Sequence, residues 1–152
     1  MIKQAELLDA VNRLLTAGWP ERMVYREDVP TDFKRPSFLL EMISFEPLPV
    51  TPVLLDCNAF ITITGFETLD VYKKMDTGRL MLLQTELLTL FAGGKLTVGN
   101  RSLNIHASGG GLAQGECFVD LQLDYLDEAA GFAPTAPPMG QIKTNIKIGG
   151  TK

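Results

Sequence analysis

The chain has 152 residues, 45% of them hydrophobic and 21% charged, a composition that excludes a disordered protein and suits a single domain with one core. Its net charge of −4 and pI near 5.0 argue against a protein that holds nucleic acid by its phosphates, because that task needs clustered basic residues. No apolar run approaches the roughly 20 residues that span a bilayer. The start of the chain carries Glu6 where a signal peptide would need an apolar stretch. We therefore expect folding in a cytoplasm and no contact with membranes.

The first predicted element is an amphipathic helix. Leu7, Val11 and Leu15 recur at helical spacing, with polar residues between them. Gly18 is in the usual position of a residue that ends a helix, and Pro20 prevents the helix from resuming.

A short strand, Met23–Arg26, is predicted next, and a turn rich in charge and proline joins it to a longer strand, Ser37–Phe45. This joint resembles a candidate site at first, but it contains no nucleophile–base pair, metal spacing or phosphate loop. We expect three aromatic residues to anchor it, Tyr25, Phe33 and Phe38. Four charged residues are expected at its surface, Glu27, Asp28, Lys34 and Arg35.

A proline-rich segment follows the longer strand. Pro47, Pro49 and Pro52 remove hydrogen-bond donors, so residues 46–53 are predicted to leave the sheet as a stiff, exposed connection. Apolar side chains in such a segment are candidates for a protein interface, here Leu48, Val50 and Val53. The next strand, Leu54–Phe66, alternates, with Ala59, Ile61 and Ile63 on one face.

The C-terminal half begins with a second helix, since leucines recur at helical spacing from Leu80 to Leu90, before Gly93 and Gly94. Strands Lys95–Val98 and Arg101–Ala107 are predicted to form a hairpin about Gly99–Asn100. Residues 108–115 are predicted to be a glycine-rich loop. The last strand, Glu116–Leu126, directs alternate apolar residues to one face: Val119, Leu121, Leu123 and Tyr125.

This order of elements predicts an α+β fold, an antiparallel or mixed β-sheet with two α-helices packed on one face. The domain should comprise residues 1–130. Residues 131–152 are rich in proline and glycine, and we expect this tail to be extended or partly disordered.

Residues that could carry chemistry are sparse. His106 is the only histidine, and it lies in a predicted strand without a local partner for catalysis or metal binding. Cys57 and Cys117 lie in apolar strand segments, where free cysteines behave as small buried hydrophobes. Gly93-Gly94-Lys95-Leu96 lacks the hydroxyl residue and the position of a phosphate loop. We expect no enzyme activity, no catalytic residue, no cofactor and no metal.

The joint and the hairpin together suggest a family. Tyr25, Glu27 and Val29, then Phe33 and Pro36-Ser37-Phe38, then Val98-Gly99-Asn100-Arg101, and finally Val119 to Tyr125 follow the order found in tail terminator proteins of long-tailed phages. The chain resembles that family over about its first 130 residues. Asp32 departs from the family, which often has glycine there, and the proline-rich tail is particular to this chain.

The resemblance implies a structural virion protein of a phage or prophage, assembled in the host cytoplasm. Its subunits would form a ring, commonly a hexamer, that caps the tail tube and joins it to the head connector. Its partners would be copies of itself, the tail tube protein and the head–tail connector proteins, without sequence-specific nucleic acid binding. Leu48, Val50, Val53 and Phe132 are the candidate interface residues. The alternatives are another neck, connector or tail-completion component, and a small-molecule-binding α+β domain.

Overall fold

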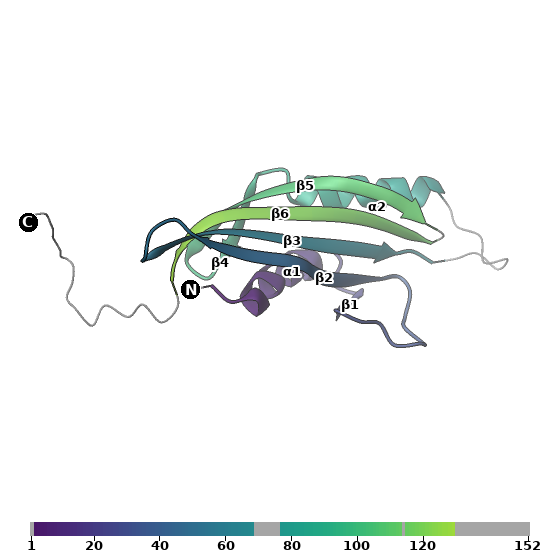
Figure 1. Ribbon diagram of the computed structural model, residues 1–152. Helices are drawn as coiled ribbons and strands as arrows, with labels where there is room; N and C mark the ends of the chain where they lie inside the picture. The colour runs from purple at the N-terminus through teal and green to yellow at the C-terminus, as the bar shows by residue number, and fades with distance from the viewer. Residues whose placement is uncertain (1, 69–76, 114, 130–152) are drawn as a thin grey trace, which may run out of the picture.

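A computed structural model describes residues 2–68, 77–113 and 115–129. The predicted order of two helices and six strands is confirmed, and Figure 1 shows their arrangement. The elements are α1 (Gln4–Gly18), β1 (Met23–Arg26), β2 (Ser37–Pro49), β3 (Leu54–Phe66), α2 (Thr77–Leu90), β4 (Lys95–Val98), β5 (Arg101–Ala113) and β6 (Glu116–Glu128).

The six strands form one mixed, strongly curled sheet in the order β1-β2-β3-β6-β5-β4. Only β1 and β2 are parallel, and the other neighbours are antiparallel. The fold is therefore α+β, as predicted. Four long strands, β2, β3, β6 and β5, lie side by side and curve together, with α2 running along β5 (Figure 1).

Side chains from both helices and from the inner face of the sheet form one apolar core. The predicted inward faces of β3 and β6 are confirmed: Ala59, Ile61, Ile63, Val119, Leu121, Leu123 and Tyr125 are all buried. Gly65 permits the close approach of α2, because a Cβ added there would lie 2.9 Å from Leu83 Cδ2 and 3.0 Å from Cys117 Sγ.

The prediction that residues 46–53 leave the sheet is wrong in its first half. β2 continues to Pro49, and Pro47 and Pro49 pair in register with Cys57 and Leu55 of β3. The reason is that β1 covers β2 only as far as Leu40, so the rest of β2 is an edge strand. A proline on an edge strand can direct its nitrogen to the open side, so that no hydrogen bond between the paired strands is lost.

The predicted glycine-rich loop is also wrong over residues 108–113, because β5 continues to Ala113 with an irregularity between Gly109 and Leu112. A side chain at Gly110 would meet Phe118, since an added Cβ would lie 3.0 Å from Phe118 Cβ. Gln84 of α2 donates from Nε2 to the carbonyl oxygens of Gly110 and Phe118, both at 2.9 Å, and holds the bulged strand.

The three predicted anchors of the joint are confirmed. The Tyr25 hydroxyl accepts a hydrogen bond from the backbone N–H of Lys34 at 3.0 Å. The Phe33 ring lies 4.6 Å from the Phe66 ring, between centroids, and Phe38 is fully buried. The joint is therefore a packed structural element.

Candidate functional site

The predicted interface residues Leu48, Val50 and Val53 lie together around the β2–β3 turn, and we call them the apolar tip. Their exposed fractions are 54%, 60% and 37%. Hydrogen bonds fix the turn: the N–H of Val50 donates to Leu54 O at 2.9 Å, and Thr51 Oγ1 accepts from the N–H of Leu54 at 3.0 Å. The tip therefore presents exposed apolar side chains on a hydrogen-bonded turn.

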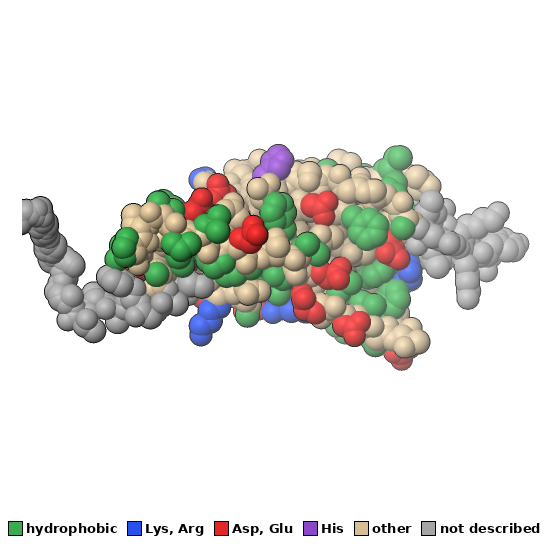
Figure 2. Space-filling model, viewed as in Figure 1, with side chains coloured by type: hydrophobic (Ala, Val, Ile, Leu, Met, Phe, Trp, Pro, Cys, Tyr) green, Lys and Arg blue, Asp and Glu red, His purple; other side chains and the backbone are tan. Residues whose placement is uncertain are grey.

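Leu126 of β6 enlarges this surface. Asp56 pairs with Leu48 on one side and with Leu126 on the other, so the three share one face, and Leu126 is 54% exposed. Figure 2 shows apolar side chains gathered at this end of the molecule. The sequence contained the signal, because Leu126 is apolar at a position where the alternation of β6 places polar residues. Phe132 lies outside the described residues.

The outward face of the sheet carries acidic side chains on three adjacent strands, as the red side chains in Figure 2 show. Strand pairing brings Glu41, Thr62 and Asp120 into one row, and Glu46, Asn58 and Asp124 into another. The pKa of Asp56 is raised, first by its hydrogen bond to Asp124, then by partial desolvation, and then by the charge of Asp124. The two carboxyl groups are therefore coupled.

We expect Asp124→Asn to lower the pKa of Asp56, because the substitution removes both the shared hydrogen bond and the like charge. A carboxyl ¹³C titration followed by NMR would measure this. Asp120→Asn is the control, since Asp120 bonds to Thr62 Oγ1 at 2.9 Å instead. An equal shift of the pKa of Asp56 in both variants would contradict the coupling.

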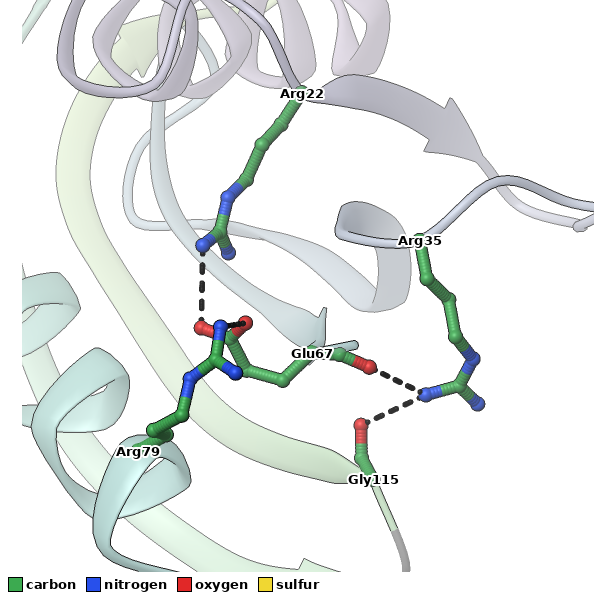
Figure 3. Close-up of polar contacts among 5 residues, drawn as sticks. All are labelled: Arg22, Arg35, Glu67, Arg79 and Gly115. Atoms are coloured by element: carbon green, nitrogen blue, oxygen red, sulfur yellow. Dashed lines mark hydrogen bonds and ion pairs between the residues drawn. The ribbon is translucent and has the colours of Figure 1, made fainter. Parts of the chain in front are cut away.

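Glu67 is a buried acid at the centre of a charge cluster, the Glu67 junction, drawn in Figure 3. Its carboxylate receives Arg22 Nη2 on Oε2 at 3.1 Å and Arg79 Nη2 on Oε1 at 3.3 Å. Arg35 Nη1 donates to the backbone oxygens of Glu67, at 2.9 Å, and Gly115, at 3.1 Å. The Glu67 side chain is only 8% exposed.

The Glu67 junction ties together segments that are distant in the sequence. Arg22 precedes β1, Arg35 precedes β2, Glu67 follows β3, Arg79 lies in α2, and Gly115 lies in the β5–β6 turn. Arg35, which was expected at the surface, is half-buried, and its guanidinium also lies 5.1 Å and 5.3 Å from the Phe33 and Phe66 ring centroids. Both carboxylate oxygens and the backbone oxygen of Glu67 accept hydrogen bonds from arginine side chains. These contacts join distant segments and therefore stabilise the fold.

Asp127 forms a second polar anchor, close to the apolar tip. Its Oδ2 accepts from the N–H of Ile2 at 2.6 Å, and its Oδ1 lies 3.1 Å from Arg101 Nη1. Burial alone would raise the pKa of Asp127, but hydrogen bonds from the N–H groups of Ile2 and Glu128, together with the charge of Arg101, outweigh burial and lower that pKa.

The lowered pKa of Asp127 makes this anchor sensitive to acid. Its stabilisation is present above the ordinary carboxyl pKa near 3.8 and is lost as the pH falls through the lower, folded value. Asp127→Asn is expected to reduce the free energy of unfolding by about 1–3 kcal/mol at pH 7 and to remove this acid dependence. Urea denaturation at pH 7 and pH 3 would test it. Equal losses at both pH values would contradict the assignment.

The remaining candidates for chemistry stand apart from one another. His106 is exposed on β5, and Cys57 and Cys117 are free and buried. Burial raises the pKa of the Cys117 thiol to about 11, which keeps it protonated and unreactive at neutral pH. Within residues 2–68, 77–113 and 115–129, no three His, Cys, Asp or Glu side chains are grouped to hold a metal ion. Neither described helix has the length and apolar character needed to cross a membrane.

No family model matches this chain, and no curated protein matches it. Fourteen chains of solved structures do match. One of them, whose name states no function, is 14% identical, covers 85% of this chain and 97% of its own length, and has a TM-score of 0.48.

Proposed function

We propose that this chain is a tail terminator of a long-tailed phage or prophage, a subunit of a homo-oligomeric ring that caps the tail tube and meets the head connector. The order of its joint, hairpin and last strand supports the family assignment. The structural observation that supports it most is the apolar tip, with its exposed apolar side chains. In this proposal the two helices pack on one face of the sheet, which leaves the other face and the tip to neighbouring proteins.

The apolar tip has the properties of a docking element. Leu48 and Val50 are more than half exposed although the turn that bears them is hydrogen-bonded and adjoins the sheet. Burying such side chains against a partner yields roughly 25 cal/mol per Å² of apolar surface. A closed ring needs two different patches that meet repeatedly, and the tip with Leu126 supplies one of them.

The acidic outward face supports the same function. Glu41, Glu46, Asp120 and Asp124 lie on neighbouring strands of one surface. DNA is repelled by such a surface, so an acidic wall facing the channel of a ring would let the genome pass without adhering. The proposal places the protein in the virion neck, after assembly in the host cytoplasm.

Leu48→Asp combined with Val50→Asp is expected to preserve folding and abolish capping. Both side chains are exposed, so the thermal midpoint should stay within a few degrees of the parent, whereas charges would oppose burial in the ring or on the tube. Negative-stain images of the tail tube protein assembled with each chain would measure tube length. The parent should limit tube growth, and the variant should not.

Leu82→Asp is the matched control, because Leu82 is 60% exposed and lies on α2, outside the tip. It should cap tubes as the parent does. Unlimited tube growth with a parent chain that stays monomeric beside the tubes would refute the terminator function. Loss of the cooperative thermal transition in the tip variant would show instead that the tip belongs to the core.

A further inference from the structure

A groove of about 440 Å³ lies between the end of α2 and β5, and we call it the β5 groove. The C-terminal half of α2 and the residues after it form one wall, and β5 forms the other (Figure 1). Its lining includes Leu88, Phe91, Ala92, Ile105, Ala107 and Gly109.

The β5 wall of this groove is an open sheet edge. β4 pairs with β5 only as far as Asn104, and the N–H of Ile105 then donates to Gly94 O at 3.1 Å. Backbone groups of an antiparallel strand alternate between its two sides, so Ala107 and Gly109 direct their N–H and C=O groups to the same side as Ile105. No strand in the part of the chain that the structure describes pairs with them there.

Parts of the other sheet edges carry features that oppose strand pairing. Along β2, Pro47 and Pro49 carry no N–H donor, and the N–H of Met42 is bonded to Glu27 Oε2 at 2.8 Å. β4 contacts α1. Natural sheets block edges in these ways to prevent unwanted pairing. The β5 edge has no proline, so each of its residues keeps an N–H donor.

The sequence contains a segment suited to this edge. Residues 142–148 read Ile-Lys-Thr-Asn-Ile-Lys-Ile, which alternates as a strand does. Ile142, Ile146 and Ile148 would share one face, and Lys143 and Lys147 the other. On an added strand, the isoleucines could contact the apolar wall of the groove while the lysines stayed in solvent.

Charge distinguishes this segment from the rest of the chain. All 18 acidic residues precede residue 129, whereas residues 130–152 contain Lys143, Lys147 and Lys152 and no acid. The outward sheet face next to β5 carries Asp120 and Asp124. Lysines on the outward side of a strand added at β5 would therefore lie near an acidic surface.

The place where the chain leaves the described structure favours a second copy as the donor. The N–H of Ala129 donates to Val53 O at 3.1 Å, so the tail begins at the apolar tip, the element that we propose to contact a neighbour. From there, the residues up to Ile142 can span at most about 45 Å.

We propose that Ile142–Ile148 of one copy adds as a strand to the β5 edge of a second copy, with its isoleucines against Leu88 and Phe91. Backbone hydrogen bonds to Ala107 and Gly109 would supply affinity, and the alternating side chains would set the register. This contact requires only self-association and therefore goes beyond the terminator function.

Amide hydrogen exchange in the full chain tests this contact directly. The N–H groups of Ala107 and Gly109 are expected to exchange at least tenfold more slowly as protein concentration rises. Ile142→Asp combined with Ile146→Asp should abolish that protection, while Met139→Asp, a similar change in the same tail, should retain it. Equal protection in the parent and in the segment variant would overturn the proposal. Protection that does not depend on protein concentration would also overturn it, because the tail would then bind to the groove of its own chain.

A mixing experiment shows by mass whether the tail segment of one chain binds to the groove of another chain. Ala107→Pro removes an edge donor without touching the tail, and Ala92→Arg fills the groove with a bulky cation as a second, independent variant. Every chain in this experiment also carries the two tip substitutions, which remove association through the apolar tip. Measured by itself, a groove variant or the segment variant should then have the mass of one chain, 16.7 kDa. A groove variant mixed with the segment variant should form a two-chain complex by light scattering. A mixture that stays single would overturn the proposal. Neither readout uses tail tubes, so a failure of tube capping is seen separately.

Discussion

Glu67→Gln is expected to lower the free energy of unfolding by about 3–5 kcal/mol, the cost of breaking a buried ion pair by removing one partner. Arg22 dominates this cost, because its side chain is only 14% exposed and its Nη1 has no hydrogen-bond partner among the described residues. Arg79 is 53% exposed, so its pair with Glu67 contributes much less. Urea denaturation monitored by Trp19 fluorescence would measure the loss.

Glu86→Gln is the matched control, since Glu86 is an exposed acid on α2, and its substitution should change stability by less than about 0.5 kcal/mol. The double variant Glu67→Gln/Arg22→Gln should be less destabilised than the sum of the two single variants, because neither charge is then left alone. If the losses of the two single variants add up to the loss of the double variant, the contribution of Glu67 to stability does not depend on Arg22.

Phe38→Ala is expected to cost about 3–5 kcal/mol, as large-to-small substitutions of buried aromatic residues do. Phe38 is fully buried near the start of β2, and its ring forms a T-shaped pair with the Trp19 ring, with centroids 5.3 Å apart. The Arg22 guanidinium lies 5.4 Å from the same ring centroid. Removing the ring would therefore open a cavity and loosen the residue that pairs with Glu67.

Phe60→Ala tests whether burial is the cause. Phe60 is also an aromatic residue of a long strand, but it is 38% exposed on the outward face, and its loss should cost less than about 1 kcal/mol. Comparable losses for the two phenylalanines in thermal or urea unfolding would contradict the position of Phe38 in the core.

The roles of Phe38 and Glu67, whose substitutions have the two largest expected effects, are not equally predictable from the sequence. Phe38 was predicted as an anchor, because an aromatic residue entering an apolar strand is a local pattern. Glu67 was not singled out, and Arg35 was assigned to the surface. Nothing local marks an acid after a strand as the partner of Arg22 and Arg79, since their contacts cross 45 and 12 residues of chain.

Local patterns were sufficient for the order of elements, the bounds of β1 and β3, the hairpin and the inward faces of β3 and β6, because the periods of helix and strand are properties of neighbouring residues. They also brought Leu48, Val50 and Val53 forward as exposed apolar residues. Only the tertiary structure decided that Pro47 lies in an edge strand, that residues 108–113 extend β5, that Leu126 joins the apolar tip and that Glu67 collects three arginines. Each of these depends on which strand or helix lies alongside, and that neighbour comes from a distant part of the chain.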